Sequence, residues 1–246
     1  MRRFLIAPDI PENTVAILSP EDSRHLVQVL RLRAGDSVQL FDGRGMEYQG
    51  TVATLHPDGV RVTVGRRQPT TAESPLELML LQGFLKETKM DLLVRQLTEV
   101  GLSHLVPFLA RRSVARPDSR RLAGRLARWR KIAAEALKQC RRGKIPSIDF
   151  AGDLDAALVR AENCDLKIVF WETAQRPLGD IVSQLSAPVH SVALLLGPEG
   201  GFEAEEVAAA QAAGFAVASL GPRILRAETA ALVACALIQH RLGDLG

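Results

Sequence analysis

The sequence predicts an α/β protein in which a small β-barrel precedes a larger domain built on a parallel sheet. The first 70 residues contain short strand patterns separated by turn residues, as small barrels do. After them, buried apolar runs of strand length alternate with helical patterns, which predicts a parallel sheet with helices on both faces. A chain of 246 residues with 47% hydrophobic and 24% charged residues suits a soluble protein of two domains.

The N-terminal domain is expected to span residues 1–70 and to contain one helix. This helix begins at Pro20, with Ser19 as its N-cap, and its apolar stripe is Leu26, Val29 and Leu30. The polar stretch Gln68–Pro75 breaks both periodicities and is expected to be the linker. The expected strands are Arg3 to Ile6, Val15 to Leu18, Ser37 to Phe41, Met46 to Leu55 and Gly59 to Gly65.

The second domain, residues 71–246, shows the α/β alternation. Its expected strands are Leu76 to Gln82, Leu105 to Leu109, Leu166 to Trp171, Val192 to Leu196 and Ala216 to Leu220. Its expected helices are Lys89 to Val100, closed by Gly101, then Asp153 to Ala161, Leu178 to Leu185 and Glu228 to Leu242, besides a basic helix within residues 111–144.

Two Gly-Pro turns, at residues 196–201 and 220–229, each join one of the last two strands to a helical pattern. Open α/β sheets bind ligands at such strand ends. The glycine spacings that hold phosphates are absent. Carboxylates at the start of the first helix would repel a phosphate and favour a neutral or cationic ligand: Glu199, Glu203, Glu205 and Glu206. Glu172, after another strand, is a further candidate contact, although all of these residues also suit ordinary connections.

Residues 111–144 hold thirteen basic and two acidic side chains, a net charge of +11 in a chain whose total is +3. Apolar residues recur at three- and four-residue steps through the same stretch, so one face of the helix is expected to be buried. Such a one-sided block favours a polyanionic partner over a merely solvated surface. The few aromatic residues and many arginines point to recognition of a nucleic-acid backbone and its shape more than to base stacking.

Other features narrow the class of protein. No apolar run approaches the length of a membrane span, and the first residues lack a secretion signal, so we expect a cytoplasmic protein. Cys140, Cys164 and Cys235 are widely spaced and have no histidine cluster near them. We therefore expect buried thiols without a disulfide framework or a metal site.

Taken together, the motifs resemble those of the RsmE-type bacterial ribosomal RNA methyltransferases, which are SPOUT enzymes. The resemblance covers nearly the whole chain, and the two Gly-Pro turns in this order are its most specific part. The matching segments are His25 to Arg31 with Gly35 and Asp36, then Lys86, Lys89 to Asp91, Glu99 and Gly101, then Gln139, Arg142 and Pro146, and finally Gly197 to Phe202 and Leu220 to Ala230.

The resemblance implies a PUA-like RNA-binding barrel followed by a trefoil-knotted SPOUT domain, with the knot at about residues 166–240, and a homodimer. It implies S-adenosylmethionine as the methyl donor and N3 of one uridine in 16S rRNA of the small ribosomal subunit as the acceptor. The donor is expected at Glu172, Leu196, Gly197, Pro198, Glu199, Gly200, Gly201, Leu220, Gly221, Ile224 and Leu225.

The chemistry requires that the uracil imide proton be removed or that its anion be stabilised. Arg223 and Arg226 are candidates for the uracil oxygens or an adjacent phosphate, and Glu199 or Glu228 for the base, if there is one. RNA contacts are expected at Arg2, Arg3, Arg31, Lys86, Lys89, Arg111, Arg112, Arg121, Arg125, Arg128 and Arg142.

Two questions stay open from the sequence. A ribosome assembly factor that binds RNA without chemistry would also contain a barrel and a basic helix, although it would not need the two turns. Alanines in the last helix suit either core packing or contact with a second subunit: Ala227, Ala230, Ala231, Ala234 and Ala236.

Overall fold

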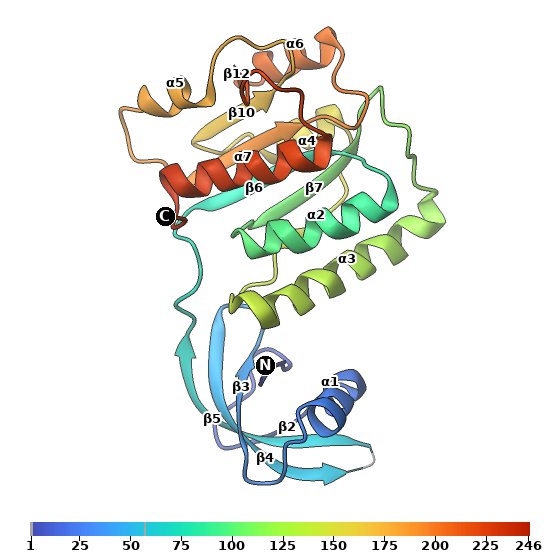
Figure 1. Ribbon diagram of the computed structural model, residues 1–246, viewed down its shortest axis with the longest axis vertical. Helices are drawn as coiled ribbons and strands as arrows, with labels where there is room; N and C mark the ends of the chain where they lie inside the picture. Colours follow the sequence, from blue (N-terminus) through green and yellow to red (C-terminus); the bar gives the residue numbers. More distant parts are fainter. Residues whose placement is uncertain (1, 57) are drawn as a thin grey trace. The chain divides into compact units, whose positions relative to one another are not determined.

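The computed structural model describes residues 2–56 and 58–246, which form two compact units (Figure 1). Unit 1 consists of Met1–Glu73 and Ala134–Ile145, and unit 2 of Ser74–Ala133 and Pro146–Gly246. Helix α3 (Ser119–Cys140) thus contributes residues to both units. Among the described residues, no helix has the length and apolar character needed to cross a membrane.

Unit 1 contains one curled five-stranded sheet in the order β1-β3-β4-β5-β2 (Figure 1). Only β1 and β3 pair in parallel. Alternate side chains of the strands, such as Leu40, Tyr48 and Val62, face the hydrophobic core. The strands are β1 (Arg3–Leu5), β2 (Val15–Ile17), β3 (Ser37–Phe41), β4 (Met46–His56) and β5 (Gly59–Pro69).

Two details of unit 1 differ from the sequence expectations. The linker begins later, because β5 continues to Pro69, which pairs with Met46. Helix α1 (Pro20–Arg24) begins as expected, with the Ser19 hydroxyl accepting the Asp22 N–H, but it passes into a π-helix, His25–Val29. The wider i→i+5 turn rotates Val29 away from Leu26, so Val29 is 66% exposed while Leu26 is buried.

The sheet of unit 2 has the order β12-β10-β11-β6-β7-β8, and β9 also pairs with β7. Every pair is parallel. Strand β11 therefore lies between β10 and β6, so the carboxyl ends of β10, β11, β12 and β6 meet along one edge. The strands are β6 (Glu77–Gly83), β7 (His104–Leu109), β8 (Ser147–Ile148), β9 (Gly152–Asp153), β10 (Leu166–Phe170), β11 (Ser191–Leu196) and β12 (Ala216–Ala218).

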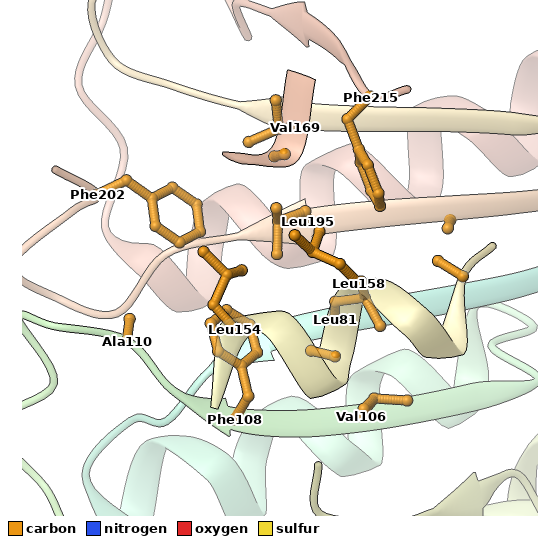
Figure 2. Packing of buried hydrophobic residues seen from close by; sticks show 14 of the residues in the cluster. Leu81, Val106, Phe108, Ala110, Leu154, Leu158, Val169, Leu195, Phe202 and Phe215 are labelled. Carbon is orange, nitrogen blue, oxygen red and sulfur yellow. The ribbon is translucent and has the colours of Figure 1, made fainter. Parts of the chain in front are cut away.

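Helices cover the sheet and enclose its hydrophobic core. Helix α7 (Ala227–Leu242) packs on β6 and β11 and against α2 (Glu87–Glu99). Helix α4 (Leu154–Arg160) packs on β7 and against α6 (Ala204–Ala212), whereas α5 (Leu178–Ser183) packs on β12. Figure 2 shows the cluster beneath α4, in which Leu81, Phe108 and Leu195 meet Leu158 and Phe202.

The basic segment is helical over a shorter range than residues 111–144. Helix α3 starts at Ser119, so Arg111, Arg112 and Arg116 lie on the connection that follows β7. Within α3, Trp129 is fully buried and its indole N–H donates to Asp91, as expected of an apolar helix face. The buried face and the exposed arginines thus coexist on α3.

Helix α7 settles part of the question about the alanines. Ala231 and Ala234 are fully buried within this chain, together with Cys235 and Ile238. They are therefore core residues, and a subunit interface cannot use them directly. Leu237, which is 39% exposed, lies on the outer face of α7.

The end of α2 allows a test of the packing. Gly101 adopts a φ of +92°, and a Cβ there would lie 2.5 Å from the amide nitrogen of the buried Gln239. Gly101→Ala should destabilise unit 2 by about 1–3 kcal/mol, which lowers the melting temperature by roughly 2–4 °C for each kcal/mol.

Gly124→Ala is the matched control. Gly124 is exposed within α3, and a Cβ there would have no atom within 4 Å. This change should raise the stability by about 0.5–1 kcal/mol, because glycine is a poor helix former. Calorimetric melting of the two variants should shift in opposite directions, and equal shifts would contradict this account.

Candidate functional site

A pocket of about 420 Å³ lies at the carboxyl edge of the unit 2 sheet. Its walls come from the ends of three strands, β10, β11 and β12, and from helices α2 and α7. Ligand pockets of parallel sheets occupy this position, and their volumes lie in this range. The lining residues are Lys89, Phe170 to Glu172, Leu196 to Phe202, Ser219 to Ala227 and Ala230.

The turn after β11 is fixed by contacts with neighbouring strands. The buried Gln82 at the end of β6 donates from its side-chain amide to the carbonyl of Gly197 at 3.0 Å. The Phe202 ring stacks on Phe108 of β7, with centroids 6.4 Å apart. Since both anchors are buried, the turn presents a rigid backbone to the pocket.

Gly200 permits a close approach by the connection that follows β7. A Cβ at Gly200 would lie 2.9 Å from the Cβ of Arg112, and the Arg112 guanidinium donates to the Gly200 carbonyl at 3.3 Å. The basic connection and the turn therefore touch directly.

The four carboxylates around the start of α6 have different roles. Glu206 is buried and accepts the backbone N–H groups of Glu203 and Arg111, each at 2.9 Å. Glu203 pairs with the Arg111 guanidinium at 2.8 Å, and Glu205 is largely exposed. These three residues lie at the N-terminus of α6, where they complement the helix dipole as expected, and two of them hold the connection that follows β7. Only Glu199 of the four lines the pocket.

Glu172, at the end of β10, also lines the pocket. One of its oxygens lies 2.8 Å from the position that a Cβ on Gly201 would take, and Gly201 has a φ of +69°. The carboxylate of Glu172 is thus brought to the turn after β11, about thirty positions later in the sequence.

A lysine joins the two turns. The Lys89 ammonium lies 3.4 Å from Glu199 Oε1 and 3.1 Å from Glu228 Oε2. Its hydrogen bond with Glu228 raises the pKa of Lys89. Burial pushes the pKa of Glu228 upward, but a backbone hydrogen bond and the charges of Lys89 and Arg226 outweigh it, so this pKa lies below its usual value.

The turn after β12 is more open. Arg223, Ile224 and Arg226 line the pocket with exposed side chains, and Ile224 is 87% exposed. Leu220, Gly221 and Leu225 complete this wall. Flexible guanidinium groups beside a pocket suit an anionic or carbonyl-bearing partner.

The residues expected to contact RNA divide into three groups. Arg3 and Arg142 are buried and pair with Glu47 and Glu73, so we remove them from the set of direct RNA contacts. Three others have intramolecular contacts: Lys89 with the two glutamates, Arg128 with Asp91, and Arg125 over the Phe84 ring. The remaining residues are exposed on their units, although Arg111 also pairs with Glu203 and Arg112 also donates to Gly200: Arg2, Arg31, Lys86, Arg111, Arg112 and Arg121.

Several pocket residues were not singled out from the sequence. Trp171 and Ser219 each follow the end of a strand, and this position was the signal in the sequence that could have identified them. Lys89 was predicted as an RNA contact and not as a pocket residue. Gln82 was detectable as a polar residue that ends an apolar strand pattern. In the described part of the chain, His, Cys, Asp and Glu form no group suited to a metal ion.

Comparisons with known proteins agree with this geometry. An RNA methyltransferase domain model matches residues 72–239, and a model of the RNA methyltransferase PUA domain matches residues 18–65. The ribosomal RNA small subunit methyltransferase E of Bacillus subtilis is 30% identical, over 98% of this chain and 97% of that protein. The chain belongs to this methyltransferase family.

Two solved structures extend the likeness. The Legionella pneumophila methyltransferase Lpg2936, in complex with SAM, is 30% identical with a TM-score of 0.90 over 99% of both chains. The ribosomal RNA small subunit methyltransferase E of Neisseria gonorrhoeae, bound to S-adenosyl methionine, is 30% identical with a TM-score of 0.88 over both whole chains. The α/β fold with its preceding PUA domain is thus confirmed, whereas the trefoil knot stays a prediction.

Membership of this family also decides between two readings of the sequence. A match to a methyltransferase domain over residues 72–239 favours an enzyme over an assembly factor that only binds RNA. The pocket at the strand ends is consistent with this, since a protein that only holds RNA has no need of it.

Proposed function

We propose that the chain transfers a methyl group from S-adenosylmethionine to N3 of one uridine in 16S rRNA of the small ribosomal subunit. The observation that carries the proposal is the pocket at the two Gly-Pro turns, which contains carboxylates and lies beside exposed arginines. Its support comes from the relatives named for small-subunit rRNA methylation and from those solved with the methyl donor.

The residues present fit such a donor. Glu199 and Glu172 supply negative charge to a pocket large enough for a nucleoside, which suits a cationic sulfonium. Within the described chain, Glu199 Oε2 is buried and has no hydrogen-bond partner. A buried acceptor of this kind requires a donor from elsewhere, and a bound ligand would provide it. The backbone at Gly197 and Gly200 would hold the rest.

In the proposed reaction N3 forms a bond to the methyl carbon while the bond from that carbon to sulfur breaks. The electron pair of the broken bond stays on sulfur, which becomes a neutral thioether, and the imide proton passes from N3 to water or to a carboxylate base. S-adenosylmethionine supplies an electrophilic methyl group on a sulfonium. Arg223 and Arg226 would hold the uracil oxygens or an adjacent phosphate, so that charge developing on the ring is neutralised.

The exposed basic residues of the connection and of the first turns of α3 would hold the RNA backbone. Arg112, Arg116, Arg120 and Arg121 are exposed and follow one another within a short segment. Arg112 also contacts Gly200, so this segment brings bound RNA near the pocket. Because the substrate would be part of the ribosome, we further propose that the protein acts in the cytoplasm.

The first test is methyl transfer from radiolabelled S-adenosylmethionine to small subunits, free rRNA and tRNA, with mapping of the modified base. We expect label at N3 of one uridine in 16S rRNA. Gly200→Val should weaken donor binding by about tenfold or more, because its side chain overlaps Arg112 and displaces the turn. RNA affinity should fall less, because Arg112 is one of several exposed basic residues in its segment. An equal fall in the affinities for S-adenosylmethionine and for RNA would show that the turn contributes to folding only.

The second test concerns the RNA phosphates. Arg120→Ala with Arg121→Ala should weaken RNA binding and reduce the log-log salt slope by about 0.7–0.9 for each phosphate that is no longer neutralised. Arg160→Ala, an exposed change on α4, is the control and should leave the slope unchanged. The measurement is a series of RNA-binding titrations at increasing salt concentration. An unchanged slope in the double variant would show that these arginines are solvated and do not contact RNA phosphates.

We also propose that the enzyme is a homodimer that uses the outer face of α7. Leu237 on α7 and Leu92 on α2 are 39% and 45% exposed, and the two helices pack together. Because Ala231 and Ala234 are core residues, charged substitutions there would disturb folding and could not test the interface.

Leu237→Arg should instead give a folded monomer, because it places a charge on the proposed contact. Leu55→Arg, at an exposed position of β4, is the control and should remain dimeric. Sedimentation at micromolar concentration measures the outcome. A wild type that sediments as a monomer and still transfers methyl groups would refute the dimer.

A further inference from the structure

The contacts of Lys89 go beyond what its expected role in RNA binding requires. One ammonium lies between two carboxylates that belong to different turns, Glu199 after β11 and Glu228 in the first turn of α7. Atoms 3.1 and 3.4 Å from one nitrogen are at most about 6.5 Å apart, so the two carboxylates are close neighbours. Their side chains are only 21% and 16% exposed.

Two partly buried carboxylates at this separation repel each other strongly when both are charged. The Lys89 ammonium offsets this repulsion, because it contacts both. Other charged groups near the pair are few: Arg226 acts on Glu228, and Arg223 and Glu172 line the same pocket. The Lys86 backbone N–H also donates to Glu199 Oε1 at 3.3 Å, whereas the Lys86 side chain is exposed.

Of these groups, only Lys89 contacts both turns. Its side chain is 28% exposed and, like that of Glu199, borders the pocket, so both groups lie beside any bound ligand. The contacts also occupy one oxygen of Glu199, Oε1, and leave Oε2 buried without a partner in the described chain.

We propose that Lys89 is a positioning residue of the pocket, which keeps Glu199 and Glu228 charged together and leaves Glu199 Oε2 as the acceptor for a donor group of the bound methyl donor. This inference rests on the proposed function for the identity of the ligand. If Lys89 has this role, neither Glu199 nor Glu228 acts as the general base, because a carboxylate stabilised by an adjacent ammonium is a poor proton acceptor. The uracil proton then passes to water instead of to either carboxylate, and Arg223 and Arg226 stabilise the imide anion that remains.

The pKa of Glu228 lies below its usual value and that of Lys89 above its usual value, so in the wild type neither group titrates near neutral pH. Without the lysine charge, repulsion favours one shared proton on the pair. That proton is lost as the pH rises, and its loss leaves a second negative charge for the cationic donor.

The experiment compares wild type, Lys89→Met, Lys89→Arg and Lys86→Met in two measurements without RNA. In the first, NMR of glutamate labelled at its carboxyl carbon follows the protein alone. In Lys89→Met we expect one carboxyl of the pair to titrate between about pH 5 and 8. In the second, calorimetry follows binding of S-adenosylmethionine, whose affinity for Lys89→Met should rise by up to about tenfold per pH unit in that range.

The other proteins should show neither effect. Lys89→Arg keeps the charge, and Lys86→Met changes a side chain that does not contact the pair. A Lys89→Met protein with wild-type carboxyl titration would overturn the inference, and so would a Lys86→Met protein that behaves like it.

The carboxyl titration of the wild-type protein tests the inference without any substitution. A carboxyl of the pair that titrates near neutral pH in wild type would overturn the inference. If wild type binds no S-adenosylmethionine at any pH, the proposed function fails, while the titration without ligand still decides the role of Lys89.

Discussion

The pocket depends on the pairing of β11 between β10 and β6. In a parallel sheet all strands end at one edge, so this order brings the turns after β10, β11 and β12 together. The hydrogen bond from Gln82 to Gly197 and the stacking of Phe202 on Phe108 then fix the central turn against its neighbours. Contacts made deep in unit 2 thus determine where the glycine backbone and Glu199 face a ligand.

The fold was largely accessible from the sequence, because its elements carry strong local signals. Apolar strand runs, the Ser19-Pro20 start and Gly101 at the end of α2 place most elements correctly. The errors fall where local patterns do not determine the conformation. The spacing of Val29 assumes an α-helix, and only the structure shows the π-helix that turns it outward.

The candidate site was less accessible, since charge in a sequence does not show what the charge contacts. Arg3 and Glu206 resemble surface residues in the sequence, yet both are buried in networks with partners far along the chain. Lys89 is predictable as a basic residue of a matching segment. Its position between two carboxylates follows only from the packing of α2 against α7.

The thiol of Cys235 gives unit 2 a built-in chemical probe. Complete burial on α7 raises the pKa of this thiol, and only a thiolate reacts readily with disulfide or maleimide reagents. The reagent therefore modifies Cys235 only when α7 separates locally from the sheet. The rate of labelling at Cys235, followed separately from that of the partly exposed Cys140 and Cys164, reports the free energy of that local opening, and ligands that bind both α7 and the turns will slow it.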